Sequence, residues 1–116
     1  MSKQWGHGYW QGVEAARAEN GSLVGLWFHS RHATGTIQWQ GRVDRAGENG
    51  SHVVQLFEWV MGEPSVQKVV SFEQMSRWDF YPTAQDMRWA YHKENGGSAD
   101  DWEHSERIVE MMNQTA

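Results

Sequence analysis

The sequence predicts an α+β domain, mostly β, in which a five-stranded antiparallel barrel carries a short N-terminal helix and two C-terminal helices. Three observations predict this class. Apolar and polar residues alternate with a period of two through much of residues 36–72, which is typical of strands that bury one face. Short turns rich in glycine interrupt this stretch, so neighbouring strands should pair antiparallel. Helix-favouring residues flank it, at 9–20 and after residue 82.

Three strands form the centre of the predicted barrel. The first covers residues 37–44, and Asn49-Gly50 is typical of a tight hairpin turn after it. The second covers residues 52–61, and both its odd- and its even-numbered residues are mostly apolar. This indicates a strand covered on both faces or a bulge that switches faces. Glycine and proline in residues 62–65 predict the next turn, and residues 66–72 predict the third strand.

Two further strands complete the predicted barrel, which spans residues 22–81. Leu23–Ser30 is expected to precede the central strands, and Trp78–Tyr81 is expected to close the barrel after a single helical turn over Phe72–Met75. Five strands in this order, with a one-turn helix before the last, match an SH3-like barrel. An open sheet packed on helices is the alternative.

An N-terminal arm and a short helix are predicted within residues 1–21. The helix-favouring run at 9–20 ends at Asn20-Gly21, a plausible C-terminal stop. In the arm before it, His7 lies between two glycines, which suits a turn that presents the imidazole or a free arm that binds nothing.

Two C-terminal helices are predicted within residues 82–116. Thr83 has the character of an N-cap, and Asp86 three residues later completes a capping-box-like pattern. This helix should end at Gly96-Gly97, and Ser98, with an aspartate three residues on, repeats the pattern before the last helix. Both helices should pack on the barrel or on a partner.

Composition excludes several classes of function. The chain has 116 residues, enough for one domain, and no cysteine, so neither disulfides nor thiolate chemistry are available. No apolar leader and no run of membrane-spanning length are visible, and the cytoplasm is the expected location. The net charge is −5, with −1 on residues 1–81 and −4 on residues 82–116. Because lysines and arginines do not cluster, the sequence disfavours a nucleic-acid partner.

No catalytic residue, metal site or cofactor is predicted. Ser30 follows His29 in the chain, but neighbours on a strand point to opposite faces and cannot act as a nucleophile and its base. His29 and His32 have the spacing of a metal-ligand pair, yet nothing else completes the three or four ligands that zinc requires.

Aromatic residues give the clearest candidate for a binding site. The chain contains eight tryptophans, more than a core of this size can enclose, so some should be half exposed where they favour ligand pockets and interfaces. Two or three rings beside an acid can hold a cation or an apolar side chain of a peptide. The residues predicted to form this site are Trp39, Trp59, Trp78 and Tyr81, with Glu58 or Asp79 as the acid.

Several short motifs resemble small uncharacterised proteins found in bacterial, phage and mobile gene-cassette DNA. The resemblance covers residues 5–91 and implies an SH3-like barrel without a transferable activity. The matching motifs are Trp5-Gly6-His7-Gly8, Leu23-Val24-Gly25-Leu26-Trp27-Phe28-His29, Trp39-Gln40-Gly41-Arg42-Val43, Val54-Gln55-Leu56-Phe57-Glu58-Trp59, Gly62-Glu63-Pro64-Ser65, and Phe80-Tyr81 followed by Asp86-Met87-Arg88.

A second, shorter resemblance concerns the plasmid-borne type II dihydrofolate reductases, which are SH3-like barrels assembled as tetramers. Residues 39–43 resemble one of their strands, and Val66-Gln67 is similar to the start of their active-site strand. The resemblance adds Gln67 to the candidate ligand-binding residues. Lys68 and Val69 replace the isoleucine and tyrosine of that family, which removes groups that hold folate and nicotinamide.

The expected function is therefore a non-enzymatic binding or adaptor module that uses an exposed aromatic patch to hold a protein or small-molecule ligand. Excess tryptophan and the amphipathic last helix favour self-association, with a dimer as the expected state. The resemblance implies a gene carried on a mobile element. The alternatives are a small enzyme with its active site between copies of the barrel, and a small nucleic-acid-binding barrel.

Overall fold

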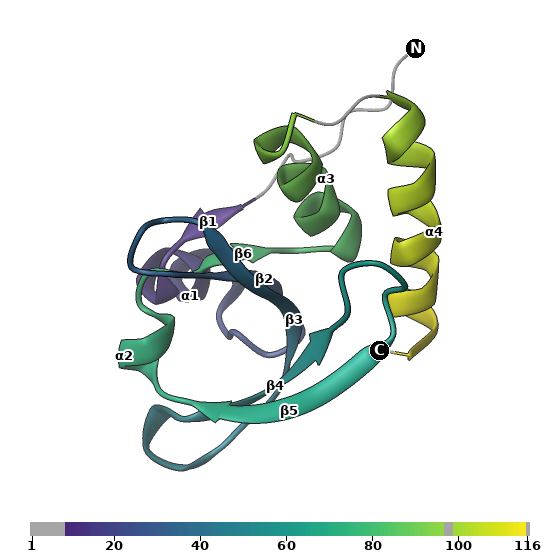
Figure 1. Cartoon of the computed structure of the whole chain (residues 1–116). Coiled ribbons are helices and arrows are strands. Elements are labelled where there is room, and N and C mark those ends of the chain that lie inside the picture. The colour runs from purple at the N-terminus through teal and green to yellow at the C-terminus, as the bar shows by residue number, and fades with distance from the viewer. Residues whose placement is uncertain (1–8, 97–98, 116) are drawn as a thin grey trace.

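The computed structural model describes residues 9–96 and 99–115, which form one six-stranded antiparallel sheet with four α-helices (Figure 1). The order across the sheet is β1-β6-β2-β3-β4-β5. The strands are β1 (Trp10–Gln11), β2 (Trp27–Arg31), β3 (Ile37–Ala46), β4 (His52–Phe57), β5 (Pro64–Val70) and β6 (Asp79–Tyr81). The helices are α1 (Val13–Asn20), α2 (Phe72–Met75), α3 (Ala84–Glu94) and α4 (Ala99–Thr115).

The sheet is open, so the prediction of a closed five-stranded barrel was wrong in strand number and in closure. β1 and β5 form its two edges. The sixth strand arises because Trp10 pairs with Phe80 of β6 instead of starting the predicted helix. Gly12 then adopts a left-handed φ of 88°, which ends β1 and lets α1 begin at Val13. The coarser prediction, an antiparallel sheet with C-terminal helices, is confirmed.

The central strands β3, β4 and β5 follow the predicted order with shifted ends. Asn49 and Gly50 have positive φ angles of 55° and 78° in the turn between β3 and β4, as an Asn-Gly turn predicts. β2 begins at Trp27 rather than Leu23, because a turn occupies the residues between them. β4 ends at Phe57, where the chain enters the turn that leads to β5.

A first core covers one face of the sheet, beneath α1 and α2. Phe28 and Phe80 are fully buried within it, and Trp10, Trp39 and Phe72 pack at its margin. Its members come from every strand except β1 and from both short helices or the turns beside them. They are Val13, Ala16, Leu23, Leu26, Phe28, Val43, Val54, Leu56, Val70, Met75, Trp78 and Phe80.

A second core lies on the opposite face, where α3 and α4 pack side by side on the sheet (Figure 1). It explains why both odd- and even-numbered residues of β4 are apolar, since Leu56 faces the first core and Phe57 faces the second. A register shift between Gln55 and Phe57 accompanies the pairing with β5. The second core consists of Trp27, Phe57, Tyr81, Ala84, Met87, Ile108, Val109 and Met112.

The helix caps agree with the sequence where the structure describes them. Thr83 Oγ1 accepts a hydrogen bond of 3.0 Å from the backbone N–H of Asp86 at the start of α3. The predicted cap at Ser98 and the predicted turn at His7 lie outside the described residues. Of the helices in residues 9–96 and 99–115, none is both long and apolar enough to cross a membrane.

Candidate functional site

The structure places the predicted aromatic residues in two separate groups. Trp78 is buried in the first core, where its ring stacks on Phe28 with 4.6 Å between centroids. Trp39 packs at the margin of the same core, and the Lys68 ammonium lies 4.9 Å from its ring centroid. These two indoles therefore stabilise the sheet on the side away from α3 and α4.

Trp59 and Tyr81 meet around His29 on the α3 side of the sheet. The imidazole of His29 lies 6.0 Å from the Trp59 ring and 5.1 Å from the Tyr81 ring. Its Nδ1 forms a 2.9 Å hydrogen bond with the Tyr81 hydroxyl. Burial raises the pKa of Tyr81, with a smaller contribution from Asp79, so the phenol stays protonated as a hydrogen-bonding group.

The predicted acids and Gln67 lie elsewhere. Glu58 is exposed in the turn after β4, and Gln67 is exposed on β5. Asp79 is buried, but its carboxylate Oδ2 lies 2.7 Å from Arg31 Nη2, and Arg31 also pairs with Glu94 at 3.0 Å. Asp79 therefore belongs to an ion network that ties β2 and β6 to α3.

Arg88 of α3 is the charged residue that sequence reasoning missed. Its side chain is only 3% exposed and lies between α3, α4 and the sheet. Nη1 donates to Gln40 Oε1 at 3.1 Å, and Nη2 donates to Ser105 Oγ at 3.3 Å. The guanidinium also lies 4.8 Å from the Tyr91 ring and 5.9 Å from the Trp59 ring, within cation–π range.

No carboxylate pairs with Arg88 within the described part of the chain. Its Nε is buried without a hydrogen-bond partner there, and so is Nε2 of His29. Burial lowers the pKa of Arg88 to about 10, against an opposing effect of Tyr91. Buried arginines are ordinarily paired with an acid, so this guanidinium is held in a state that an anion would stabilise.

Arg88 also disfavours protonation of His29. Burial, together with the smaller effects of the positive charges of Arg31 and Arg88, lowers the pKa of His29 to about 3. The imidazole is therefore neutral at physiological pH. Nδ1 is hydrogen-bonded to the Tyr81 hydroxyl, and Nε2 is buried without a partner among the described residues.

A hollow of about 310 Å³ opens beside Arg88, between α3, α4 and the turn after β4. The volume is at the lower end for small-molecule pockets. Its wall combines aromatic, apolar and hydrogen-bonding side chains. The lining residues are Trp59, Val60, Arg88, Tyr91, His92, Asn95, His104, Ser105 and Ile108.

The aromatic pair Trp59 and Tyr91 separates this hollow from a neighbouring one. Their rings stack with 4.6 Å between centroids and an interplanar angle of 25°. On the other side of the pair a hollow of about 380 Å³ is bordered by Thr36, Ile37 and Glu94. The pair is half buried, so it forms an aromatic ridge that a ligand can contact from either side.

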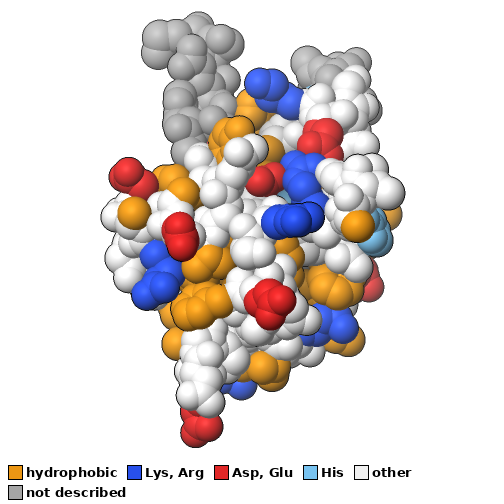
Figure 2. Space-filling model, turned by 90° about the vertical axis from the view of Figure 1, so that its left-hand side faces the viewer, with side chains coloured by type: hydrophobic (Ala, Val, Ile, Leu, Met, Phe, Trp, Pro, Cys, Tyr) orange, Lys and Arg blue, Asp and Glu red, His pale blue; other side chains and the backbone are white. Residues whose placement is uncertain are grey.

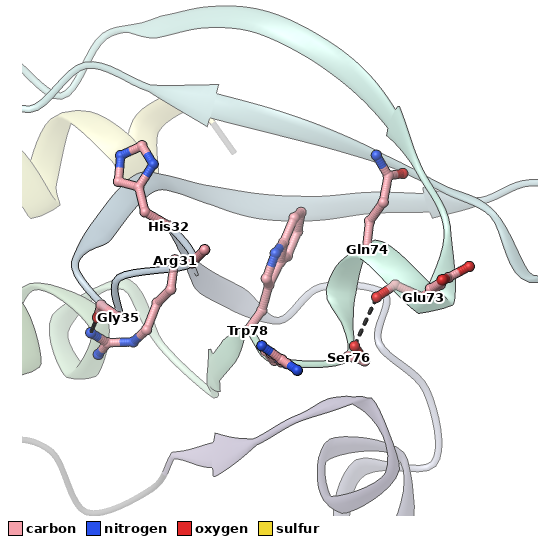
Figure 3. A pocket seen from close by; sticks show the side chains of 9 residues that line it. Arg31, His32, Gly35, Glu73, Gln74, Ser76 and Trp78 are labelled. Carbon is pink, nitrogen blue, oxygen red and sulfur yellow. Dashed lines mark hydrogen bonds between the residues drawn. The ribbon is translucent and has the colours of Figure 1, made fainter.

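Another hollow, of about 510 Å³, lies between the β2–β3 loop and α2 (Figure 3). Several of its polar groups already bond to the protein itself. Arg31 Nη1 donates to the carbonyl of Gly35 at 2.7 Å, and Ser76 Oγ donates to the carbonyl of Glu73 at 2.8 Å. Trp78, at the centre of Figure 3, is only 5% exposed, because its ring packs in the first core. The Arg88 hollow is therefore better equipped to bind a charged group.

Surface charge does not mark a nucleic-acid interface on the face shown in Figure 2. Basic, acidic and apolar side chains are interspersed there, and the basic residues form no continuous stripe.

Within the described residues, no group of three or more histidines, aspartates or glutamates is arranged to hold a metal ion.

No protein-family model, curated protein or solved structure matches this chain.

Proposed function

We propose that this protein is a binding module whose ligand presents a carboxylate to Arg88 beside the Trp59–Tyr91 ridge. The single observation that carries the proposal is a guanidinium 3% exposed that borders a pocket and pairs with no carboxylate of the described chain. A planar carboxylate matches the fork of N–H groups on arginine. Such a ligand would supply the missing negative charge.

The neighbouring groups suit a small organic carboxylate or the C-terminal end of a peptide. Trp59 and Tyr91 offer aromatic surface for the apolar part of the ligand. The side chains of Asn95 and Ser105, which also line the pocket, offer hydrogen-bonding groups. A pocket of about 310 Å³ holds a group of this size and excludes a folded partner from the guanidinium.

The order of β6, β2, β3, β4 and β5, with the one-turn helix α2 before β6, supports an SH3-like relationship for residues 22–81. In this interpretation α3 and α4 are additions that cover the outer face of the sheet and build the pocket against it. The adaptor role expected from the sequence is compatible with this arrangement, since the ligand site lies between the sheet and the added helices.

Titration calorimetry with acetate, benzoate, succinate and a short peptide, free or amidated at its C-terminus, tests the proposal. At least one carboxylate should bind saturably, and the amidated peptide should bind less tightly than the free one. Arg88→Met should weaken binding at least tenfold, which is about 1.4 kcal/mol. Arg107→Met, which removes an exposed arginine of α4, should leave binding unchanged.

Inorganic phosphate distinguishes carboxylate recognition from general attraction of anions. If phosphate binds as tightly as the best carboxylate, the fork geometry is not the basis of selection. Equal binding by the wild type and Arg88→Met, or no binding of any carboxylate, contradicts the proposed function.

A further inference from the structure

β5 is an edge strand whose outer side is open. Six of its seven residues are exposed, and it pairs with β4 alone. Figure 1 shows it as the outermost strand of the sheet, at the opposite edge from β1. Because the peptide groups of an edge strand alternate in direction, every second residue turns its N–H and C=O away from β4. A row of backbone donors and acceptors is therefore available to another strand.

The usual protections of an edge strand are weak in β5. Val66 is 56% exposed and Val69 is 70% exposed, on opposite faces of the sheet. Proline occurs only at its first residue, Pro64, and the register shift with β4 lies at the same end. Its one charged residue, Lys68, lies over the ring of Trp39. Long, exposed and apolar edges of this kind pair with other strands.

We propose that β5 is the interface with a second copy of this chain, paired antiparallel about a twofold axis perpendicular to the sheet. A backbone ladder is self-complementary under that symmetry, because each strand offers the same donors and acceptors in reverse order. The axis must pass midway between one residue and the same residue of the partner subunit, because paired residues point to the same face of the sheet.

Charge and length select one register of this pairing. When Gln67 faces Gln67 of the partner subunit, all seven residues of the strand have a partner, with Pro64 opposite Val70 of the partner subunit. Lys68 then faces Val66 of the partner subunit. The register centred on Lys68 would place two ammonium groups opposite each other, which is unfavourable. We therefore place the twofold axis between Gln67 and Gln67 of the partner subunit.

The exposed turn before β5 adds apolar surface to this interface. Val60 is 66% exposed and Met61 is 55% exposed, and the turn that carries them leads directly into Pro64. The twofold axis brings this end of the strand next to the end of β5 in the partner subunit, where α2 begins. A second copy therefore covers apolar residues beyond the strand itself.

Cysteine crosslinking tests the register, because the native chain contains no cysteine. Gln67→Cys should form a disulfide-linked dimer under mild oxidation, since this residue faces its own copy. Val69→Cys is the matched control. It is equally accessible in a monomer, but it faces Ser65 of the partner subunit and should crosslink much less. Equal crosslinking of both variants, or none, overturns the assignment.

Sedimentation equilibrium tests the interface without crosslinks. The wild type should form dimers at micromolar concentration, and Gln67→Lys, which places two lysines opposite each other, should raise the dissociation constant at least tenfold. Ser65→Lys adds the same charge opposite a valine and should have a smaller effect. A wild type that stays monomeric at hundreds of micromolar contradicts the proposal, even if it binds strands of other proteins.

Discussion

Arg31, which is partly buried, and Arg88, which is buried, lie in opposite electrostatic settings. Arg31 contacts two carboxylates, and one of them, Asp79, is itself buried. Arg88 contacts an amide, a hydroxyl and two aromatic rings, none of which carries a charge. An uncompensated buried cation lowers the free energy of unfolding, whereas a paired one need not. The two residues should therefore respond differently to the same substitution.

Substituting methionine for each arginine separates the two roles. Arg31→Met leaves Asp79 buried without its cation, so we expect the free energy of unfolding to fall by about 2–4 kcal/mol. Arg88→Met removes a charge that has no counterpart, so we expect a loss of less than about 1 kcal/mol, or a gain. Urea denaturation of both variants measures the difference. A larger loss for Arg88→Met than for Arg31→Met would show that Arg88 is primarily structural.

His29 gives the protein a pH dependence with a defined sign. Its pKa falls from 6.5 to about 3 on folding, so the unfolded chain binds this proton at a higher pH than the folded chain does. The stabilisation is complete above pH 6.5 and is lost progressively as the pH falls towards 3, by at most about 1.4 kcal/mol per pH unit. Denaturation between pH 7 and 5 measures this slope.

A variant identifies the residue responsible for the slope. His29→Gln cannot be protonated, so its free energy of unfolding should depend less steeply on pH over this range than that of the wild type. His32→Gln removes an exposed histidine from the neighbouring loop and should keep the steeper dependence. Identical slopes in the wild type and His29→Gln would contradict the role of His29.

Sequence patterns found part of the candidate site and missed its charged centre. Trp59 and Tyr81 were among the predicted aromatic residues, and both contact His29. Arg88 was not singled out, because on a helix an arginine usually faces solvent. Its partners Gln40 and Ser105 come from β3 and α4, 48 and 17 residues away. Only the packing of α3 and α4 on the sheet reveals that these three residues meet.

At the scale of elements, the turn between β4 and β5 is fitted closely against α4. Gly62 has a φ of 71°, and a Cβ atom there would lie 2.7 Å from Ile108 Cγ2 and 2.8 Å from the Ile108 carbonyl oxygen. Both the left-handed backbone and the close approach require glycine. This contact fixes α4 against the turn that carries Trp59, and so it helps to shape the pocket.

Alanine substitutions at two left-handed glycines test that contact. Gly62→Ala should lower the free energy of unfolding by about 2–4 kcal/mol, because backbone strain and overpacking against α4 add. Gly35→Ala has the same kind of strain, with a φ of 93°, but nothing within 4 Å of the added carbon, so about 1 kcal/mol is expected. Thermal or urea denaturation compares them. Equal losses would show that α4 yields at this point.

The elements themselves were easier to predict than their ends. Alternation and the Asn49-Gly50 turn predict β3 and β4 because period and turn chemistry are local properties. The helix expected over residues 9–20 was too long, since pairing of β1 with β6 depends on a strand far along the chain. Closure of the barrel also depends on contacts between strands far apart in the chain. The prediction of closure was wrong because the edge strands β1 and β5 do not pair with each other.

At the scale of the whole molecule, one sheet separates two apolar cores and should make them unfold together. Met75 of the first core and Met112 of the second are both fully buried. Strands such as β4 contribute side chains to both cores, so neither can be disrupted without disturbing the sheet. The chain should therefore behave as a single cooperative unit.

Matched methionine substitutions test this cooperativity. Met75→Ala and Met112→Ala should each lower the free energy of unfolding by about 2–5 kcal/mol through the cavity that each creates. In both variants, circular dichroism and tryptophan fluorescence should report the same denaturation midpoint. Two separate transitions in Met112→Ala would show that α3 and α4 detach from the sheet independently.

The position of α4 at the end of the described chain has a consequence during biosynthesis. A ribosome delivers the sheet and α3 before it delivers Ser105, Ile108 and Met112, which complete the pocket and the second core. Until α4 is synthesised, the second core lacks Ile108, Val109 and Met112, so part of its apolar surface stays exposed. The pocket beside Arg88 therefore forms only after the ribosome has synthesised α4, which supplies Ser105 and Ile108.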